Sequence, residues 1–407
     1  MRAKRIPQTQ ANETSNKNVR APSRKSKEKF KIFSKLKLFS IRSGMDIPFL
    51  FLVLTILVVG LIMMFSASYP YAFYHNHDSF FFIKRQFIFA VLGVIAMIFV
   101  SYIDYTKLHK LVIPFLGTSF VLLILVLIMP PMNGVHRWIQ LGSFSFQASE
   151  ITKFAIILSF SHFISHNLHR MHTFKYGILP YLIILAPTIV LLALEPHISC
   201  SVIVILLAAG MLFIGGVKLR WFGMVLGAIA SALIYLVVFT DKLTYANNRI
   251  SGWLDPFGAA SGVDTWQTRQ GLYAIGSGGI LGLGLGNSRQ KYLYIPEPQN
   301  DFIFSVVCEE LGFVGAVAIL LLFALLVWRG MVISMRAKDK FGMLLGIGLT
   351  AQVGLQVILN IAVVTNTIPN TGISLPFFSY GGTSLMMLLA QMGVILSISR
   401  SSHLQKS

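Results

Sequence analysis

The feature that most constrains this chain is a series of ten apolar segments, each long enough to cross a lipid bilayer as a helix. About 20 apolar residues span the hydrocarbon core in helical form. No water is available there to hydrogen-bond the backbone, so a spanning segment of this kind must be a helix. The segments lie near residues 47–67, 86–103, 111–130, 150–166, 178–194, 199–216, 221–239, 303–328, 341–363 and 382–399. We therefore predict an all-α polytopic membrane protein with about ten transmembrane helices.

Composition excludes a water-soluble protein of the same length. Of 407 residues, 55% are hydrophobic and 12% are charged, whereas soluble domains carry about 25% charged residues. The net charge is +19, and 13 of the 34 Lys and Arg residues fall within residues 1–45, beside the first apolar segment. Anionic lipid headgroups attract basic residues at such a position, so we predict contact with the membrane and not with nucleic acid.

The charge distribution predicts the topology. Placing the N-terminus in the cytoplasm leaves 25 of the 34 Lys and Arg residues on the inner side, as the positive-inside rule requires. Ten spans return the C-terminus to the cytoplasm. The predicted organisation is a basic, largely disordered cytoplasmic tail over residues 1–45, a membrane domain over 46–399 with a large extracellular loop at 240–302, and a cytoplasmic tail over 400–407.

Asp301 is the strongest candidate for chemistry in the outer part of the chain. It follows the polar stretch Pro296–Asn300 and precedes Phe302 at the start of the eighth span. A carboxylate at the headgroup level is partly desolvated, which raises its pKa and its basicity as a proton acceptor. The alternative is a helix cap, with Asp301 accepting hydrogen bonds from the free N–H groups of that span.

Two adjacent carboxylates, Glu309 and Glu310, lie about two turns inside the same span. They point about 100° apart around the helix, so at most one can face a given cavity. We favour a structural role, with Lys153 or Arg137 as the partner in an ion pair, over a role in ion or proton handling.

Glycine in the stretch Gly276–Gly286 lets the backbone bend and approach closely, and the stretch Asn366–Ser384, with its prolines and glycines, cannot be a plain helix. Irregular backbone at membrane depth is tolerated where it lines a cavity. Arg289 and Lys291 follow the first stretch and suit phosphate groups. The sequence shows no HExxH motif, nucleophile elbow, P-loop or Cys/His cluster, so it favours work on an anionic lipid at the outer leaflet without serine or metal hydrolysis.

Two long motifs, Tyr294–Phe304 (YIPEPQNDFIF) and Pro369–Ser384 (PNTGISLPFFSYGGTS), closely resemble the SEDS family of shape, elongation, division and sporulation proteins. Shorter matches at 137–139, 147–153, 267–291 and 309–312 extend the resemblance over nearly all of the chain after the tail. The run Gly284–Lys291 resembles the FtsW and SpoVE branches more than RodA.

Two residues depart from the family pattern. Ala148 replaces a usual proline, which is a mild change, and His197 replaces a usual aspartate. Because the second change removes an outer carboxylate, we assign no catalytic role to Glu195 or His197.

The resemblance implies a multi-pass peptidoglycan glycosyltransferase of the bacterial plasma membrane, concentrated at the division septum. Such an enzyme polymerises lipid II into β-1,4 glycan strands at the outer face, for the septum or the spore cortex. It would work with a class B penicillin-binding protein and other division proteins.

The resemblance also assigns roles to individual residues. The catalytic aspartate of the family falls on Asp301, and a divalent cation such as Mg²⁺ or Mn²⁺ could share the charge of the pyrophosphate, with no metal ligand assigned. The candidate substrate-binding residues are Arg137, Glu150, Lys153, Arg249, Arg289, Lys291, Glu297, Ser379 and Tyr380. The candidate structural or cavity residues are Glu309, Glu310, Gly381 and Gly382.

Two other functions compete with the enzyme. A lipid II flippase would use the same substrate and would place its essential ionisable residues midway through the membrane. A non-enzymatic division scaffold would leave the long outer segment without chemistry. The position of Asp301 at the outer edge favours the enzyme.

Overall fold

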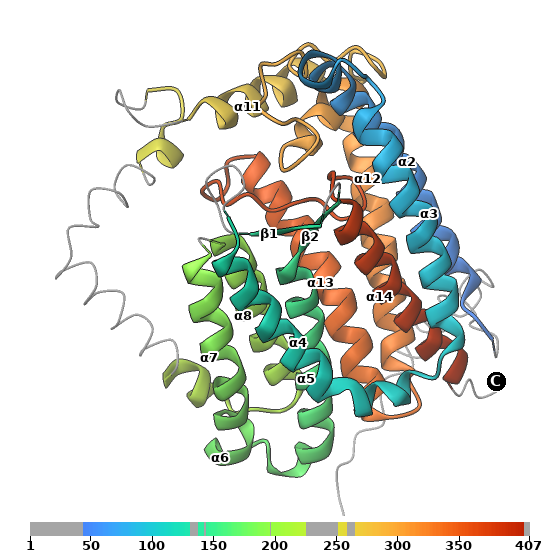
Figure 1. The fold of residues 1–407 in the computed structure, drawn as a ribbon, viewed down its shortest axis with the longest axis vertical. Coiled ribbons are helices and arrows are strands. Elements are labelled where there is room, and N and C mark those ends of the chain that lie inside the picture. The colour runs from blue at the N-terminus through green and yellow to red at the C-terminus, as the bar shows by residue number, and fades with distance from the viewer. Residues whose placement is uncertain are drawn as a thin grey trace, which may run out of the picture. The chain divides into compact units, whose positions relative to one another are not determined.

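A computed structural model describes residues 44–130, 137–141, 144–195, 197–224, 251–258 and 265–402. Within these ranges the chain is helical apart from one antiparallel β-hairpin and the connecting loops (Figure 1). Almost all of the predicted N-terminal tail, most of the predicted span at 221–239 and part of the predicted loop at 240–302 lie outside the described residues.

Nine of the predicted spans coincide with helices in the described part of the chain. These are α2 (Ile47–Asn76), α3 (Phe81–Tyr102), α4 (Leu108–Ile128), α5 (Ala148–Asn167), α7 (Leu179–Leu194), α8 (Ile198–Ile214), α12 (Ile303–Met335), α13 (Lys340–Val364) and α14 (Gly382–Ser401). The shorter elements are η2 (Tyr105–Lys107), η3 (Leu168–Arg170), α6 (Phe174–Gly177), α11 (Trp266–Gly278) and the paired strands β1 (Trp138–Leu141) and β2 (Phe144–Gln147).

Six of the described helices are long and apolar enough to cross a membrane, and α7 and α8 are shorter apolar helices. The all-α polytopic class is thus confirmed. The number of crossings and the side on which each loop lies stay predictions.

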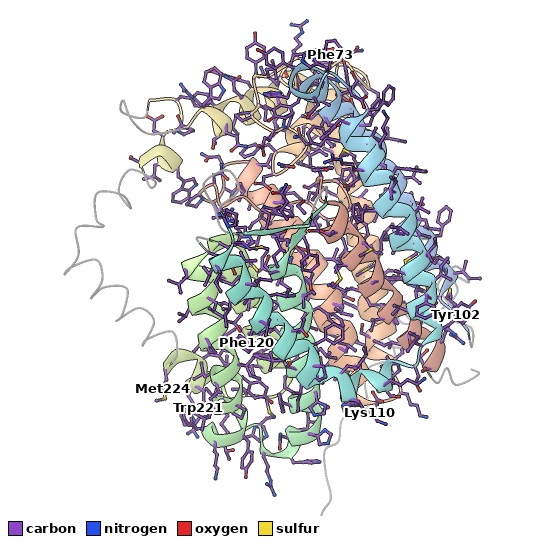
Figure 2. All side chains as sticks on the ribbon, viewed as in Figure 1. Phe73, Tyr102, Lys110, Phe120, Trp221 and Met224 are labelled. Atoms are coloured by element: carbon purple, nitrogen blue, oxygen red, sulfur yellow. The ribbon has the colours of Figure 1, made fainter. Side chains whose placement is uncertain are left out.

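The helices differ in how much of their surface is covered by protein. In the most apolar windows of α13 and α14, 61% and 67% of the residues are buried, against 22% in those of α3 and α4. Helices α13 and α14 therefore form the centre of the bundle, and the outer faces of α3 and α4 are left for lipid. Figure 2 shows the exposed aromatic side chains of Phe73 and Tyr102 near opposite ends of the bundle, as expected for membrane interfaces.

Helix α3 packs along α14, and small residues set the spacing. A Cβ atom added at Gly93 would lie 2.6 Å from Leu389 Cδ1, and one added at Gly393 would lie 2.5 Å from the Met97 carbonyl oxygen. Glycine at these positions allows the two backbones to approach closely, which is the usual way of packing helices in lipid.

Helix α12 contains a sharp kink at Gly312, where φ is 66°. The kink breaks helical hydrogen bonds, and the loop after α11 replaces them. Leu283 N and Gly284 N donate to the carbonyl oxygens of Glu309 and Glu310 at 2.9 and 3.0 Å. The loop after α11 is thereby fixed to the helix, and buried backbone groups at the kink are paired.

Candidate functional site

A cavity of 630 Å³ opens beside the β-hairpin, between the ends of α3, α5, α8 and α14 and the loop that precedes α12. In Figure 1 the hairpin crosses above α13, next to the loop that leads into α14. Polar and charged side chains from these separate elements line the cavity, which is large enough for a sugar-sized ligand.

Two segments that are distant in sequence form one wall and are joined by backbone contacts. Tyr380 N donates to the Gln299 carbonyl oxygen at 2.8 Å, and Ser379 Oγ donates to the Asn300 carbonyl oxygen at 2.8 Å. Ser379 Oγ also accepts from Leu375 N at 2.8 Å. Ser379 thus uses its hydroxyl to hold the wall together, and both Ser379 and Tyr380 line the cavity.

Asn360 from α13 fixes the backbone of Asp301. Its buried side-chain amide donates to the carbonyl oxygens of Asp301 and Ile373 at 2.8 and 2.6 Å. Gly372 lies opposite the carboxyl group, and a Cβ there would come within 3.0 Å of Asp301 Oδ2. The φ of Gly372 is +70°, which also favours glycine. The position of Asp301 is therefore set by α13 and by the loop that precedes α14.

The carboxyl group of Asp301 lines the cavity and, among the described residues, accepts no hydrogen bond. Helix α12 begins after Phe302 and has no side-chain cap, so the helix-cap alternative for Asp301 is wrong. Burial and the charge of Glu297 raise the pKa of Asp301 to about 6, and the charge of Arg137 opposes this shift. The carboxylate of Asp301 therefore accepts no hydrogen bond from the described residues and is more basic than an ordinary aspartate, as a proton acceptor requires.

Two arginines line the cavity from different parts of the chain. Arg137 stands at the start of β1, where its charge acts on Asp301, Glu195 and His197. Arg85 lies in the first turns of α3, with its guanidinium 4.2 Å from the centre of the Phe81 ring.

The sequence prediction missed Arg85 because the predicted span began at residue 86. A cation at the end of an apolar segment was the available signal. Burial raises the pKa of Tyr380, and the charge of Arg85 opposes that shift.

Lys153 and Glu150 form an ion pair on α5, with Nζ 2.8 Å from Oε1, and both line the cavity. The predicted pairing of Lys153 with Glu309 or Glu310 is therefore wrong. The charge of Lys153 is balanced by Glu150, and Arg137 and Arg85 bring further positive charge to the cavity that can meet an anionic ligand.

Glu195 and His197 lie between α7 and α8, and His197 lines the cavity. Burial raises the pKa of Glu195 to about 8, opposed by Arg137, and burial lowers the pKa of His197 to about 3. Both side chains are consequently uncharged near neutral pH. His197 lines the cavity as a neutral imidazole where the family pattern has an acid.

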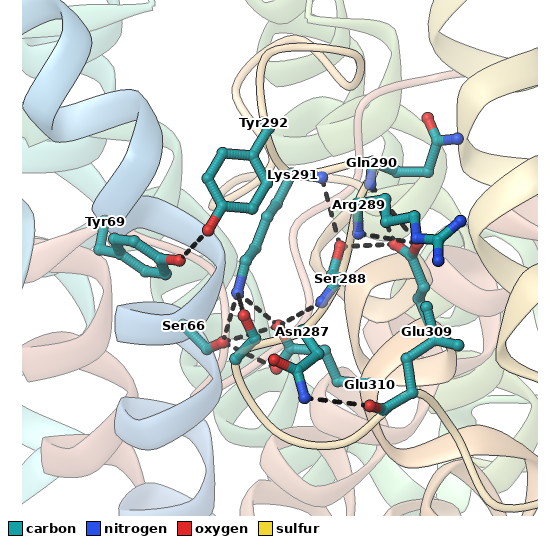
Figure 3. A network of polar contacts seen from close by, with 12 residues as sticks. Ser66, Tyr69, Asn287, Ser288, Arg289, Gln290, Lys291, Tyr292, Glu309 and Glu310 are labelled. Carbon is teal, nitrogen blue, oxygen red and sulfur yellow. Dashed lines mark hydrogen bonds and ion pairs between the residues drawn. The ribbon is translucent and has the colours of Figure 1, made fainter.

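Lys291 lies outside the cavity and is fully buried (Figure 3). Its ammonium group contacts Glu310 Oε1 at 2.7 Å and Ser66 Oγ at 3.2 Å. Glu309 accepts hydrogen bonds from the Arg289 backbone N–H at 3.0 Å and from the Ser288 hydroxyl. Glu309 and Glu310 thus have the structural role that was favoured, but with partners other than the predicted ones.

The remaining candidates also divide into residues that line the cavity and residues that do not. Glu297, Gly381 and Gly382 line the cavity. Arg289 is exposed and does not line it, and Arg249 lies outside the described residues. The structure thus argues against substrate contact for Lys291 and Arg289, and the other described candidates meet in one place.

The chain matches the cell cycle protein family that comprises FtsW, RodA and SpoVE over residues 47–404. It is 40% identical over 368 residues to stage V sporulation protein E of Bacillus subtilis, covering 89% of this chain and 99% of that protein. It is 37% identical over 357 residues to a protein of Trichlorobacter lovleyi named probable peptidoglycan glycosyltransferase FtsW, covering 87% and 93%.

Solved structures show the same fold. A chain from a peptidoglycan synthase complex that coordinates polymerization and crosslinking matches with a TM-score of 0.71 at 27% identity, covering 88% of this chain and 98% of that one. The rod shape determining protein RodA of Thermus thermophilus matches with a TM-score of 0.64 at 26% identity, covering 89% and 98%.

Proposed function

This chain belongs to the FtsW, RodA and SpoVE family of cell cycle proteins, and from that premise we propose that its cavity is the site of lipid II polymerisation, with Asp301 as the general base. The protein is a multi-pass membrane peptidoglycan glycosyltransferase, which is the activity named for its FtsW relatives. The observation that supports the role of Asp301 is its carboxylate, which lines the cavity without a hydrogen-bond donor among the described residues.

The reaction needs a base on one side of a sugar and positive charge on the other. Asp301 takes the proton from the 4-hydroxyl of the acceptor as that oxygen attacks the anomeric carbon of the donor. The bond from that carbon to the undecaprenyl pyrophosphate breaks, and attack from the opposite face gives a β-1,4 linkage with inversion. Arg137 and Arg85 stabilise the pyrophosphate as negative charge builds up on it.

The carboxylate of Glu297 is the cavity group that would hold an Mg²⁺ or Mn²⁺ ion while Asp301 accepts the proton, since hard cations prefer oxygen ligands. Glu150 is less suitable because it is paired with Lys153. A requirement for such an ion stays a prediction, which chelation during the polymerisation assay would check.

The likeness to a chain of a peptidoglycan synthase complex supports a penicillin-binding partner for transpeptidation. We propose a class B penicillin-binding protein, acting with other division proteins at the septum or during spore formation. If the isolated chain already has full polymerase activity and adding the cognate partner does not change it, this assignment is contradicted.

The deciding experiment replaces Asp301 with Asn and follows polymerisation of labelled lipid II by the purified protein with its partner. Asn keeps the size of the side chain but cannot take the proton, so Asp301→Asn should lose at least about 10²-fold in rate while folding normally. Asp78→Asn is the matched control, because Asp78 is an exposed aspartate that pairs with Lys84 outside the cavity.

Near wild-type chain formation by a well-folded Asp301→Asn variant would overturn the mechanism. Movement of lipid II between leaflets without any chain product would favour the flippase.

A further inference from the structure

Three histidines from two helices meet at the end of the bundle opposite the cavity. His109 lies in the first turn of α4, and His162 and His166 lie in the last two turns of α5. Their ligand nitrogens all lie within 4.8 Å of one another. The sequence prediction found no Cys/His cluster, because His109 comes from a different segment. The spacing of His162 and His166 by four residues was the available signal.

We propose that His109, His162 and His166 form a binding site for a Zn²⁺ ion, which ties α4 to α5. Residues four apart on a helix project from the same face, and two histidines with this spacing bind zinc in known proteins. Three imidazoles with a water molecule in the fourth position form a tetrahedral zinc site. Imidazole nitrogen is a ligand that Zn²⁺ accepts readily, whereas Mg²⁺ prefers oxygen.

The geometry is close to what zinc requires. Zinc–nitrogen bonds of about 2.0–2.1 Å place tetrahedral ligand atoms about 3.4 Å apart. His109 Nδ1 and His162 Nδ1 are already 2.7 Å apart, in a hydrogen bond in which one ring nitrogen must be unprotonated. Zinc binds unprotonated nitrogen, so small rotations of the three side chains suffice to receive the ion.

The rings are also held in place. His109 stacks on Phe341 of α13 with a centroid distance of 3.7 Å and an interplanar angle of 28°. The carboxylate of Asp339 interacts electrostatically with His109 and partly offsets the basic residues at this end of the bundle. His166 is exposed, which leaves a path for the ion and room for the water ligand.

This site is separate from the cavity. Lys153 lies nine residues before His162 on α5, which corresponds to about 14 Å along the helix. The ion would connect the C-terminal end of α5 to α4, whereas Lys153 and Glu150 lie near the N-terminal end of α5. Under the predicted topology it binds from the cytoplasm.

Zinc binding to the purified full-length chain tests the proposal, with the chain in lipid nanodiscs and carrying a purification tag that lacks histidine. After treatment with a chelator and removal of the chelator, titration should show one equivalent of Zn²⁺ per chain. His166→Gln should weaken binding by more than the roughly 10- to 100-fold that changes around metal ligands cause. His169→Gln is the matched control, an exposed histidine next to the cluster but outside it.

Thermal unfolding provides the second readout. Zn²⁺ should raise the unfolding temperature of the wild type and of His169→Gln, but not of His166→Gln or His109→Gln. Because His166 is exposed, its replacement should leave the unfolding temperature without zinc unchanged. If the wild type shows no saturable binding of Zn²⁺, or if His166→Gln and His169→Gln bind Zn²⁺ with equal affinity, the proposed site is wrong. The hydrogen bond between His109 and His162 would then be the only interaction left to explain.

Discussion

At the scale of single residues, the environment of Asp301 explains how a carboxylate can act as a base near neutral pH. Burial and the charge of Glu297 raise its pKa to about 6, and Arg137 limits the shift. A group with this pKa is mostly ionised at pH 7 and is still more basic than an ordinary aspartate. General bases work best when their pKa lies close to the working pH.

This environment predicts an acid limb in the pH profile of polymerisation. Asp301 must be ionised to accept a proton, so the rate should fall as the pH drops through about 6. Glu297→Gln removes a negative charge that disfavours ionisation, so it should move the midpoint to lower pH. Arg137→Gln removes the stabilising cation and should move it to higher pH. Initial rates with labelled lipid II between pH 5 and 8 measure the three midpoints.

The control for this prediction is Asp78→Asn, which changes a carboxylate outside the cavity and should leave the midpoint in place. A midpoint that does not move in either cavity variant would show that a group other than Asp301 limits the rate.

At the scale of elements, the kink in α12 and the loop after α11 depend on each other. The kink at Gly312 frees carbonyl groups that the loop amides pair with, and the side chains of Glu309 and Glu310 bind the next part of the loop. Lys291 is the one cation of this network with its side chain fully buried among the described residues. The network fixes the loop after α11, which leads towards Asp301.

Removing Lys291 should therefore destabilise the protein strongly. Lys291→Met leaves Glu310 as a buried charge without its cation, which typically costs about 3–5 kcal/mol. Lys291→Met with Glu310→Leu removes both charges and should recover much of that loss. Denaturant or thermal unfolding of the purified variants measures the differences.

Arg289→Met, two residues away, changes a cation on the surface and should alter stability by no more than about 0.5 kcal/mol. Equal destabilisation by the Lys291 and Arg289 variants would contradict the network.

At the scale of the whole molecule, the membrane-facing helices separate two ends with different chemistry. One end carries the cavity, α11 and the loop that leads to Asp301 (Figure 1). The other end carries basic residues such as Lys110, Arg220 and Arg400, and Figure 2 shows Lys110 together with Trp221 there. The positive-inside rule assigns the second end to the cytoplasm.

Labelling of single cysteines in intact cells checks this orientation. Cys200 and Cys308 are buried, so they contribute little background. A membrane-impermeant thiol reagent should modify Asn287→Cys, an exposed position near the outer loop, and should not modify Lys110→Cys until the membrane is permeabilised. Labelling in the opposite pattern would reverse the topology and place the cavity on the inner side.

The sequence by itself determined the helical membrane fold and the segment that carries the catalytic candidate. In lipid, each spanning segment must satisfy its own backbone hydrogen bonds, so a local apolar pattern is enough to predict a helix. The approximate positions of α2, α3 and α12 could be read in this way. The motif around Asp301 could also be recognised, because it is continuous in the chain.

Only the tertiary structure decided which charged side chains from different segments form ion pairs or line the cavity. Lys291 pairs with Glu310 and not with a phosphate, and Arg85 enters the cavity from α3. These outcomes depend on how segments that are up to hundreds of residues apart pack against one another. Apolar periodicity gives the length of a helix but not the neighbour that its polar residues face. For that reason the fold followed from local pattern, while the partners of the ionisable groups followed from packing.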